Sequence, residues 1–262
     1  MRLYRSHGLG NDYLVLEEGG PLSPALVRAV CHRNEGVGSD GILEPVPPRE
    51  GADYGLRIHN PDGTEAEKSG NGLRIYADWL VRERGAPASF TVWTPGGVVR
   101  CAVDGPRVRV AMGRAVVGTP RELAGVTVYP VNVGNPHAVV LDIPADWEAV
   151  GARVEHAVAG RTNVQFVSFT PPSTIVARVW ERGAGRTRSS GSSACAVAAV
   201  GVMLGRVATP VRVEMEGGVL NVGVAADGSV DLEGPVERVG RIEVDAEWLA
   251  RGAWRQRADT SG

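Results

Sequence analysis

A polar block followed by a helical apolar pattern is the clearest feature of the hydrophobic pattern along this chain. Apolar residues recur at the i, i+3, i+4 spacing of one helical face at Leu73, Tyr76, Ala77, Leu80 and Val81. A strand over 57–59 that we expect to be buried, and the turn Asn60-Pro61-Asp62-Gly63, precede them. The helix is therefore predicted to begin at Ser69-Gly70-Asn71-Gly72, where serine caps free N–H groups and glycine lets other atoms approach the backbone.

The same transition occurs a second time, 121 positions later. Ser190-Gly191-Ser192-Ser193 precedes the segment 194–204, which is apolar on nearly all sides. A helix with this pattern is fully buried, and strands wrapped around it would provide that environment.

The two halves of the chain share further landmarks in the same order. Gly96-Gly97 corresponds to Gly217-Gly218 at the offset of 121, and Gly10-Asn11 corresponds to Gly134-Asn135 at an offset of 124. Two copies at so long a period indicate two similar domains rather than a solenoid. We place these domains at 1–115 and 116–262, with their junction within 113–120.

Other elements follow from the same patterns. The sequence predicts strand, loop and strand over 1–17, a helix over 23–32 that Ser23 caps, strands over 163–169 and 175–180, and a helix near 246–251. The segment 36–41 has the spacing G-x-G-x-x-G, but it follows a helix and precedes a strand. A dinucleotide-binding site needs the reverse order and is therefore excluded.

Composition and charge narrow the functional classes. A chain of 262 residues suits two domains, each long enough for its own core. The net charge of −2 argues against nucleic-acid or anionic-membrane partners, and no apolar run reaches the length of a membrane span. The first twenty residues contain no apolar segment typical of a secretion signal. The scattered cysteines Cys31, Cys101 and Cys195 show no metal spacing, so we expect a reduced, cytoplasmic protein without a metal site.

The N-termini of the two predicted helices are the candidate functional sites of this chain. A glycine-flanked helix N-terminus suits a carboxylate or phosphate, although Ser69 on its own is more typical of a simple N-cap. The repetition of the pattern favours a functional site. His137 offers a general acid or base, or a hydrogen bond that anchors its loop.

Five motifs in order resemble those of the diaminopimelate epimerase family, whose members are cofactor-free amino-acid epimerases. The resemblance extends from His7 to about Glu243 and rests on the segments 7–12 (HGLGND), 60–65 (NPDGTE), 70–72 (GNG), 134–137 (GNPH) and 181–185 (ERGAG). It implies an α+β fold of two pseudo-symmetric domains, each a mixed β-sheet rolled around a central helix, with the active site in the cleft between them. It also implies a small amino-acid substrate, no cofactor and a role in lysine and peptidoglycan precursor biosynthesis. The sequence leaves open whether the protein forms a homodimer.

The resemblance also implies roles for particular residues. The backbone amides of Gly70-Asn71 and Gly191-Ser192 would hold the substrate α-carboxylate, and His137 would support the site. The positions of the other substrate contacts are Asn11, Asn60, Asn135, Asn163, Glu181 and Arg182.

Inversion of a carbon centre explains why the site is duplicated. One group removes a proton on one face and another returns a proton on the opposite face, while helix N-termini stabilise the developing negative charge. The family carries its two catalytic cysteines at the positions of Ser69 and Ser190. A thiol with a pKa of about 8.5 ionises near neutrality, whereas a serine hydroxyl is a far weaker acid that needs an adjacent base.

Further departures surround the second serine. Arg186 stands where the family usually has glutamate, and Arg188 is nearby, so we expect added positive charge that depresses a hydroxyl pKa or binds a more anionic ligand. Cys195 is predicted to pack in the core rather than to replace Ser190.

Three functions stay open from the sequence. The first is an epimerase or racemase of an amino acid such as diaminopimelate, which we favour, with slow or absent turnover. The second is a lyase that removes the α-proton and expels a β-substituent. The third is an inactive descendant that binds an amino acid.

Overall fold

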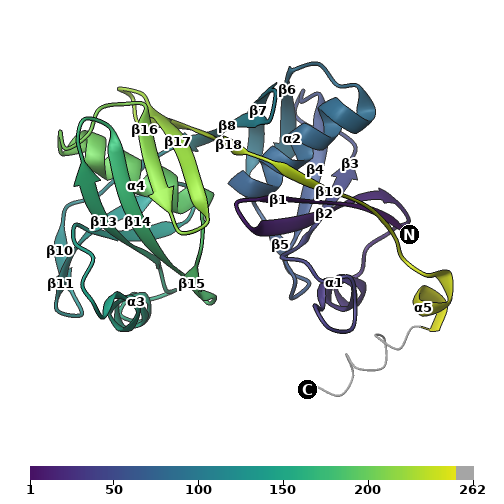
Figure 1. Ribbon diagram of the computed structural model, residues 1–262, viewed down its shortest axis with the longest axis horizontal. Helices are drawn as coiled ribbons and strands as arrows, with labels where there is room; N and C mark the ends of the chain where they lie inside the picture. The colour runs from purple at the N-terminus through teal and green to yellow at the C-terminus, as the bar shows by residue number, and fades with distance from the viewer. Residues whose placement is uncertain (252–262) are drawn as a thin grey trace. The chain divides into compact units, whose positions relative to one another are not determined.

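The chain forms two units, each with its own sheet and central helix. The computed structural model describes residues 1–251 (Figure 1). One unit comprises Met1–Val108 and the chain from Val236 onward, and the other comprises Arg109–Pro235.

The first unit is a mixed sheet with three helices. Its antiparallel pairs are β1–β2, β3–β4 and β6–β7, and its parallel pairs are β2–β3 and β4–β6. Because parallel neighbours need a crossover connection, α1 links one parallel pair and α2 links the other. The elements are β1 (Arg2–Gly8), β2 (Asn11–Glu18), α1 (Pro24–Cys31), β3 (Ile42–Val46), β4 (Tyr54–His59), β5 (Glu65–Ala66), α2 (Gly70–Arg84), β6 (Ser89–Thr94), β7 (Gly97–Asp104), β19 (Glu237–Glu243) and α5 (Ala246–Arg251).

The second unit repeats this pairing order. Its antiparallel pairs are β11–β12, β13–β14 and β16–β17, and its parallel pairs are β12–β13 and β14–β16, crossed by α3 and α4. The elements are β9 (Val116–Val117), β10 (Arg121–Leu123), β11 (Val126–Asn132), β12 (Pro136–Val140), α3 (Trp147–His156), β13 (Asn163–Thr170), β14 (Thr174–Glu181), β15 (Gly185–Thr187), α4 (Gly191–Met203), β16 (Val211–Met215), β17 (Gly218–Val224) and β18 (Ser229–Pro235). The predicted α+β fold of two similar domains is confirmed.

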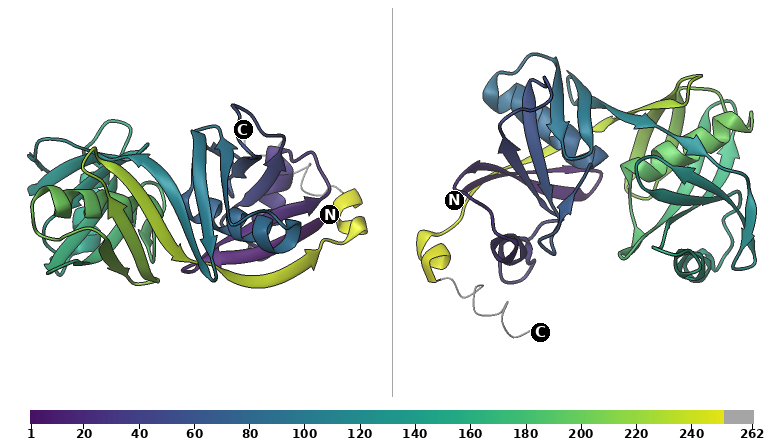
Figure 2. Two further views of the ribbon diagram at one scale, coloured as in Figure 1. Left: turned by 90° about the horizontal axis from the view of Figure 1, so that it is seen from above. Right: turned by 180° about the vertical axis from the view of Figure 1, so that it is seen from behind.

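The helices α2 and α4 form the centres of the two cores. In α4 every residue from Ala194 to Gly201 is buried, and the helix contacts β9, β11 to β14 and β16 to β18 of its own unit. Figures 1 and 2 show this green helix surrounded by the strands of that unit. In α2, burial covers all residues from Gly70 to Leu80, including the fully buried Arg74. The amphipathic stripe therefore locates α2 correctly but underestimates its burial, because the rolled sheet covers the polar positions as well.

The last strand joins the first unit. Strand β19 pairs along β1, and β8 (Arg107–Arg114) pairs with β18. The predicted ranges 1–115 and 116–262 differ from the observed units here, since the chain changes unit at 108/109 and again at 235/236. An alternating strand pattern does not specify which distant edge a strand will join, so the repeat could not assign β19.

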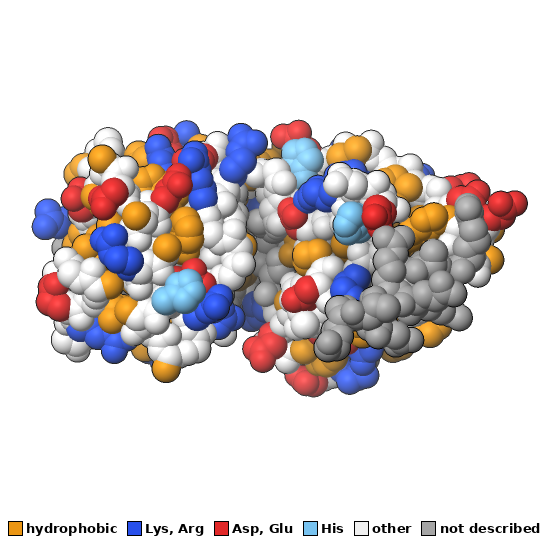
Figure 3. All heavy atoms as spheres, turned by 90° about the horizontal axis from the view of Figure 1, so that it is seen from below, with side chains coloured by type: hydrophobic (Ala, Val, Ile, Leu, Met, Phe, Trp, Pro, Cys, Tyr) orange, Lys and Arg blue, Asp and Glu red, His pale blue; other side chains and the backbone are white. Residues whose placement is uncertain are grey.

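Two surface properties bear on partners. On the face shown in Figure 3, basic and acidic side chains are interspersed, and no large area of one sign covers the described atoms. No helix within residues 1–251 is long and apolar enough to cross a membrane.

Candidate active site

Ser69 begins α2 and contacts two groups in the first unit. Its backbone is extended, and its Oγ accepts a hydrogen bond from the Gly72 N–H at 3.0 Å. The Tyr13 hydroxyl on β2 lies 3.3 Å from the same oxygen. Capping uses one lone pair of Ser69 and leaves the hydroxyl proton for another acceptor, so an N-cap role does not exclude proton transfer.

Gly72 allows this geometry. A Cβ at this position would lie 3.0 Å from Leu43 Cδ2 and 3.3 Å from both Cβ and Oγ of Ser69. The glycine therefore lets the first turn of α2 pack closely against β3 and the cap.

Asn11 and Asn71, which lie 60 positions apart, meet beside this helix start. The Asn71 side-chain amide donates to Asn11 Oδ1 at 3.0 Å, and the Asn11 amide donates to Asp40 Oδ2 at 2.9 Å. The buried Arg74 donates to Asn71 Oδ1. These bonds fix both asparagines in one orientation, as a binding site requires.

Asn60 occupies the turn after β4. Its side-chain amide donates to Thr64 Oγ1 at 2.9 Å, and its backbone N–H donates to the Thr64 carbonyl at 2.8 Å. Within the described residues, no hydrogen bond joins the Asn60 side chain to Asn11, Asn71 or Ser69.

Ser190 stands at the equivalent position of α4, with a different local role. Its backbone is extended like that of Ser69, but its side chain makes no capping hydrogen bond, and it is 8% exposed. The neighbouring Ser189 Oγ is buried and has no hydrogen-bond partner within residues 1–251. Ser190 is therefore free of the local bond that holds Ser69.

A chain of hydrogen bonds through the buried side chains of His137 and Gln165 connects Asn135 to the first turn of α4. His137 donates from Nε2 to Asn135 Oδ1 at 2.9 Å and accepts at Nδ1 from the Gln165 amide at 3.0 Å. The same amide donates to Ser193 Oγ at 3.0 Å. Burial lowers the pKa of His137 to about 4, so its imidazole is neutral at pH 7. With both ring nitrogens occupied, His137 anchors Asn135, which is the second of the two roles that the sequence left open.

Asn163 ties two loops together in the same unit. Its amide donates to the Pro136 carbonyl at 2.9 Å, and its Oδ1 accepts from the Arg182 N–H at 3.0 Å. The Arg182 side chain is exposed and reaches the Gly160 carbonyl only at 3.4 Å. Glu181 accepts from Thr187 Oγ1 at 3.0 Å. The predicted contact residues of this unit thus share one connected region, with the Arg182 guanidinium at its surface.

Arg186 does not add the free positive charge that was expected from the sequence. Its guanidinium contacts Glu216 Oε2 at 3.0 Å and Glu148 Oε1 at 2.8 Å, and lies 5.8 Å from the Trp147 ring centroid. Two carboxylates therefore offset the positive charge that the sequence assigned to the site. Arg188 is exposed, and Cys195 is fully buried in α4, as its core role predicts.

No functional role was predicted from the sequence for three side chains that lie beside the helix starts. Tyr13 contacts Ser69, and Gln165 is a polar residue between the apolar Val164 and Phe166 in β13. Lys68 directly precedes Ser69 and is the only lysine in the chain. The position of Gln165 between two apolar residues and the single occurrence of lysine, at Lys68, can both be seen in the sequence.

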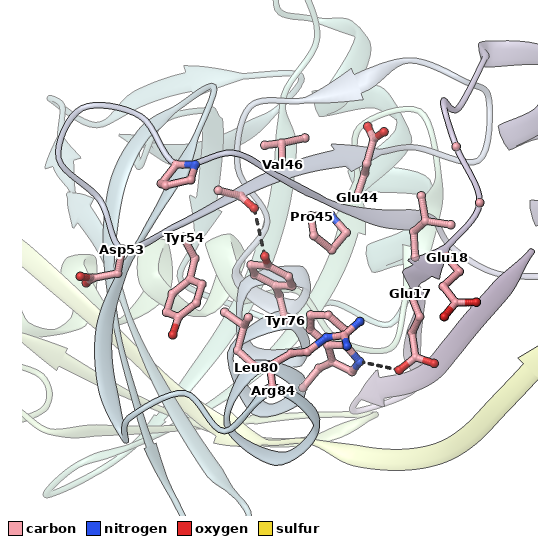
Figure 4. Close-up of a pocket in the computed structure, with 16 residues that line it drawn as sticks. Glu17, Glu18, Glu44, Pro45, Val46, Asp53, Tyr54, Tyr76, Leu80 and Arg84 are labelled. Atoms are coloured by element: carbon pink, nitrogen blue, oxygen red, sulfur yellow. Dashed lines mark hydrogen bonds between the residues drawn. The ribbon is translucent and has the colours of Figure 1, made fainter.

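The cavity in Figure 4 lies elsewhere in the first unit. It has a volume of about 590 Å³ and is lined by β2, β3, β4 and the second half of α2, the half away from Ser69. Its inner polar groups are paired: Glu17 accepts from Trp79 Nε1 at 3.1 Å, and the Tyr76 hydroxyl donates to the Gly55 carbonyl at 3.0 Å. None of the predicted site residues lines it. Within residues 1–251, no group of three or more His, Cys, Asp or Glu side chains is placed to hold a metal ion.

Known proteins resemble the chain over nearly its whole length. The family model for diaminopimelate epimerase matches residues 3–118 and 129–239. Diaminopimelate epimerase 2 of a Nostoc species is 36% identical across 95% of this chain and 98% of its own. Diaminopimelate epimerase of Desulforudis audaxviator is 38% identical across 95% and 99%, respectively.

A solved structure agrees on the fold. A predicted epimerase from Pseudomonas aeruginosa matches with a TM-score of 0.71 and 20% identity, over 93% of this chain and 98% of that chain. Both units of the present structure are included in the family match. The chain belongs to the diaminopimelate epimerase family.

Proposed function

We propose that the protein is a cofactor-independent isomerase that removes and returns the α-proton of an amino acid of the diaminopimelate type. One observation carries this function: each unit begins its central helix with a serine followed by glycine, at equivalent points of the same topology. The first N–H groups of a helix have no partner within the helix, so each start offers donors to a carboxylate.

Ser69 and Ser190 are the proposed proton-transfer groups, one for each face of the substrate carbon. Loss of the α-proton spreads negative charge onto the carboxylate. The amides of Gly70-Asn71 and Gly191-Ser192 would stabilise that charge through oriented N–H groups.

The surrounding side chains would recognise the rest of the ligand. Asn11 and Asn135 are held in fixed orientations by Asp40 and His137, which limits the entropy lost on binding. We assign the far polar group of the substrate to Arg182, with Asn60 and Asn163, because the Arg182 guanidinium is exposed.

The serines also favour a second candidate, an amino-acid-binding protein without turnover. A hydroxyl transfers protons poorly unless a base assists it, and the binding residues do not depend on such a base.

Proton NMR of the protein with LL-diaminopimelate in D₂O separates the two candidates. The isomerase replaces the α-proton with deuterium, so the α-proton signal decays. A signal that persists for days at substrate concentrations that raise thermal stability would reject the isomerase and favour the binding protein.

A further inference from the structure

Helices α1 and α3 occupy equivalent places in the two units, because each connects a parallel pair of strands. The buried residues of α1 are Leu26, Val27, Val30 and Cys31, and those of α3 are Val150, Gly151, Val154 and Glu155. Each member of the first set has its counterpart 124 positions later, the offset that also relates Gly10 to Gly134. The fold therefore buries the same positions of this helix in both units.

Two of these positions differ in kind between the units, and both differences adjoin Trp180 of β14. Val27 corresponds to Gly151, where a Cβ would lie 2.9 Å from Trp180 Cγ. Cys31 corresponds to Glu155, whose Oε2 accepts from Trp180 Nε1 at 2.8 Å. A wholly apolar set is sufficient for the helix of the first unit, so the fold itself does not require a buried carboxylate here.

Glu155 is a buried carboxylate whose two oxygens both accept hydrogen bonds. The residue is 3% exposed, and its Oε1 accepts from the Gly183 N–H at 2.8 Å and lies 3.5 Å from Arg161 Nη1. Burial acts to raise the pKa of Glu155, but the hydrogen bonds from Trp180 and Gly183 hold this pKa below its ordinary value. The side chain is therefore an ionised acceptor at neutral pH.

The same carboxylate holds the turn that carries Arg182. The Arg182 N–H donates to Asn163 Oδ1 at 3.0 Å, and the next N–H along the chain, that of Gly183, donates to Glu155. Gly183 has a φ of 78°, which glycine adopts without strain. Both peptide groups that flank the Arg182 Cα are thus held by buried side chains.

We propose that Glu155 is a positioning residue for Arg182, an inference that rests on the function proposed above, in which Arg182 takes the far polar group of the substrate. Glu155 does not need to contact the substrate, since it acts through the backbone of Arg182 and through Trp180. A turn that is already ordered loses less conformational entropy when the ligand binds. The second unit therefore uses two helix positions to hold its ligand-recognition residue.

The test is a double-mutant cycle on the affinity for LL-diaminopimelate, measured by calorimetry. Glu155→Gln keeps the size of the side chain but turns an NH₂ group toward one of its two N–H donors, so we expect binding to weaken about tenfold. In an Arg182→Ala background the same change should alter affinity by less than about twofold, because the residue through which Glu155 acts is already absent. A merely structural role would weaken binding in both backgrounds.

A second variant tests the conflict between donors directly. Trp180→Phe removes the indole N–H and keeps an aromatic ring, so that only the Gly183 N–H needs an acceptor, which an amide oxygen can supply. Trp180→Phe combined with Glu155→Gln should therefore bind at least about threefold more tightly than Glu155→Gln alone. Thermal unfolding of each free variant checks that the protein is folded.

Glu122→Gln is the matched control. It makes the same substitution at an exposed glutamate of the same unit, which accepts from the Thr127 hydroxyl on the neighbouring strand. An amide oxygen can also accept this bond, so affinity should stay within about twofold of wild type.

The outcomes separate this inference from the proposed function. Four results overturn the positioning role and leave the isomerase standing: wild-type affinity in Glu155→Gln, an equal loss in the Arg182→Ala background, unchanged affinity in Arg182→Ala itself, or no recovery with Trp180→Phe. A wild type that binds no diaminopimelate overturns the proposed function and this inference with it. Binding without α-proton exchange in D₂O rejects the isomerase alone, and the expected cycle then still supports the role of Glu155.

Discussion

At the scale of single residues, the proposed chemistry depends on Ser69 and Ser190. They differ in their surroundings, since Ser69 caps α2 and contacts Tyr13 whereas Ser190 makes no capping bond. Both carry hydroxyls, at the two positions where the resemblance to the family implies thiols. The rate of proton transfer should therefore respond to the acidity of these two atoms.

Ser69→Cys with Ser190→Cys should raise the rate of α-proton exchange, and either Ser→Ala change should abolish it. A proton-transfer group works best with a pKa near the operating pH, and a thiol at about 8.5 lies much closer than a hydroxyl. Exchange is followed by proton NMR in D₂O. Exchange that survives both Ser→Ala changes would contradict the two-serine mechanism.

Arg182→Ala should weaken amino-acid binding by at least tenfold without changing the thermal unfolding midpoint of the free protein. The Arg182 side chain is exposed and makes only a 3.4 Å contact with Gly160, so its loss leaves no buried group unpaired. Binding is measured by calorimetry with LL-diaminopimelate. Unchanged affinity would indicate a structural role for Arg182 in its turn.

His137 should make stability fall in mild acid. Its folded-state pKa of about 4 lies below the ordinary 6.5, so the unfolded chain binds the proton more readily between these values. Stability from this group is complete above about pH 6.5 and is lost as pH falls toward about 4. The free energy of unfolding, measured with urea at several pH values, should fall less steeply between pH 7 and pH 4 in His137→Gln than in wild type. Equal slopes in both proteins would show that His137 is not buried and neutral.

At the scale of elements, the two central helices depend on close packing. Gly201 in α4 illustrates this dependence, since a Cβ there would lie 2.9 Å from both Ile175 Cδ1 and Val207 Cγ2. The glycine has no special backbone conformation to maintain, so its role is to leave room for the strands that wrap α4.

Gly201→Ala should destabilise the protein by about 1–3 kcal/mol, the usual cost of overpacking a core. The change improves helix propensity by up to about 1 kcal/mol, so a net loss identifies the steric effect. The control Gly118→Ala adds a Cβ no closer than 3.6 Å to a neighbour and should change stability by less than about 0.5 kcal/mol. Urea unfolding measures both, and a more stable Gly201→Ala would show that the core can relax.

At the scale of the whole molecule, strand pairing divides the chain. Strands β9 to β18 pair among themselves and with β8, whereas β19 pairs with β1. A fragment of residues 107–235 should therefore fold cooperatively, as judged by circular dichroism and urea unfolding. A fragment of residues 116–262 lacks β8 and carries β19 without β1, so it should be less stable. Equal stability of the two fragments would contradict this division.

The sequence alone determined the duplication, the position of both helix starts and the residues that flank them. These features are local or periodic: caps, glycines and apolar spacing act within a few residues, and a repeat preserves their order. The pairing of Ser69 with α2 and of Ser190 with α4 is therefore visible without coordinates.

The tertiary structure decided which distant groups meet. It brought Tyr13 to Ser69, joined Asn11 to Asn71, and connected Asn135 to Ser193 through His137 and Gln165. It also paired Arg186 with two glutamates and placed β19 beside β1. Each contact joins residues that different strands and helices carry, and only the folded sheet sets those distances. Local patterns cannot encode them, because many pairings satisfy the same alternation of apolar and polar positions.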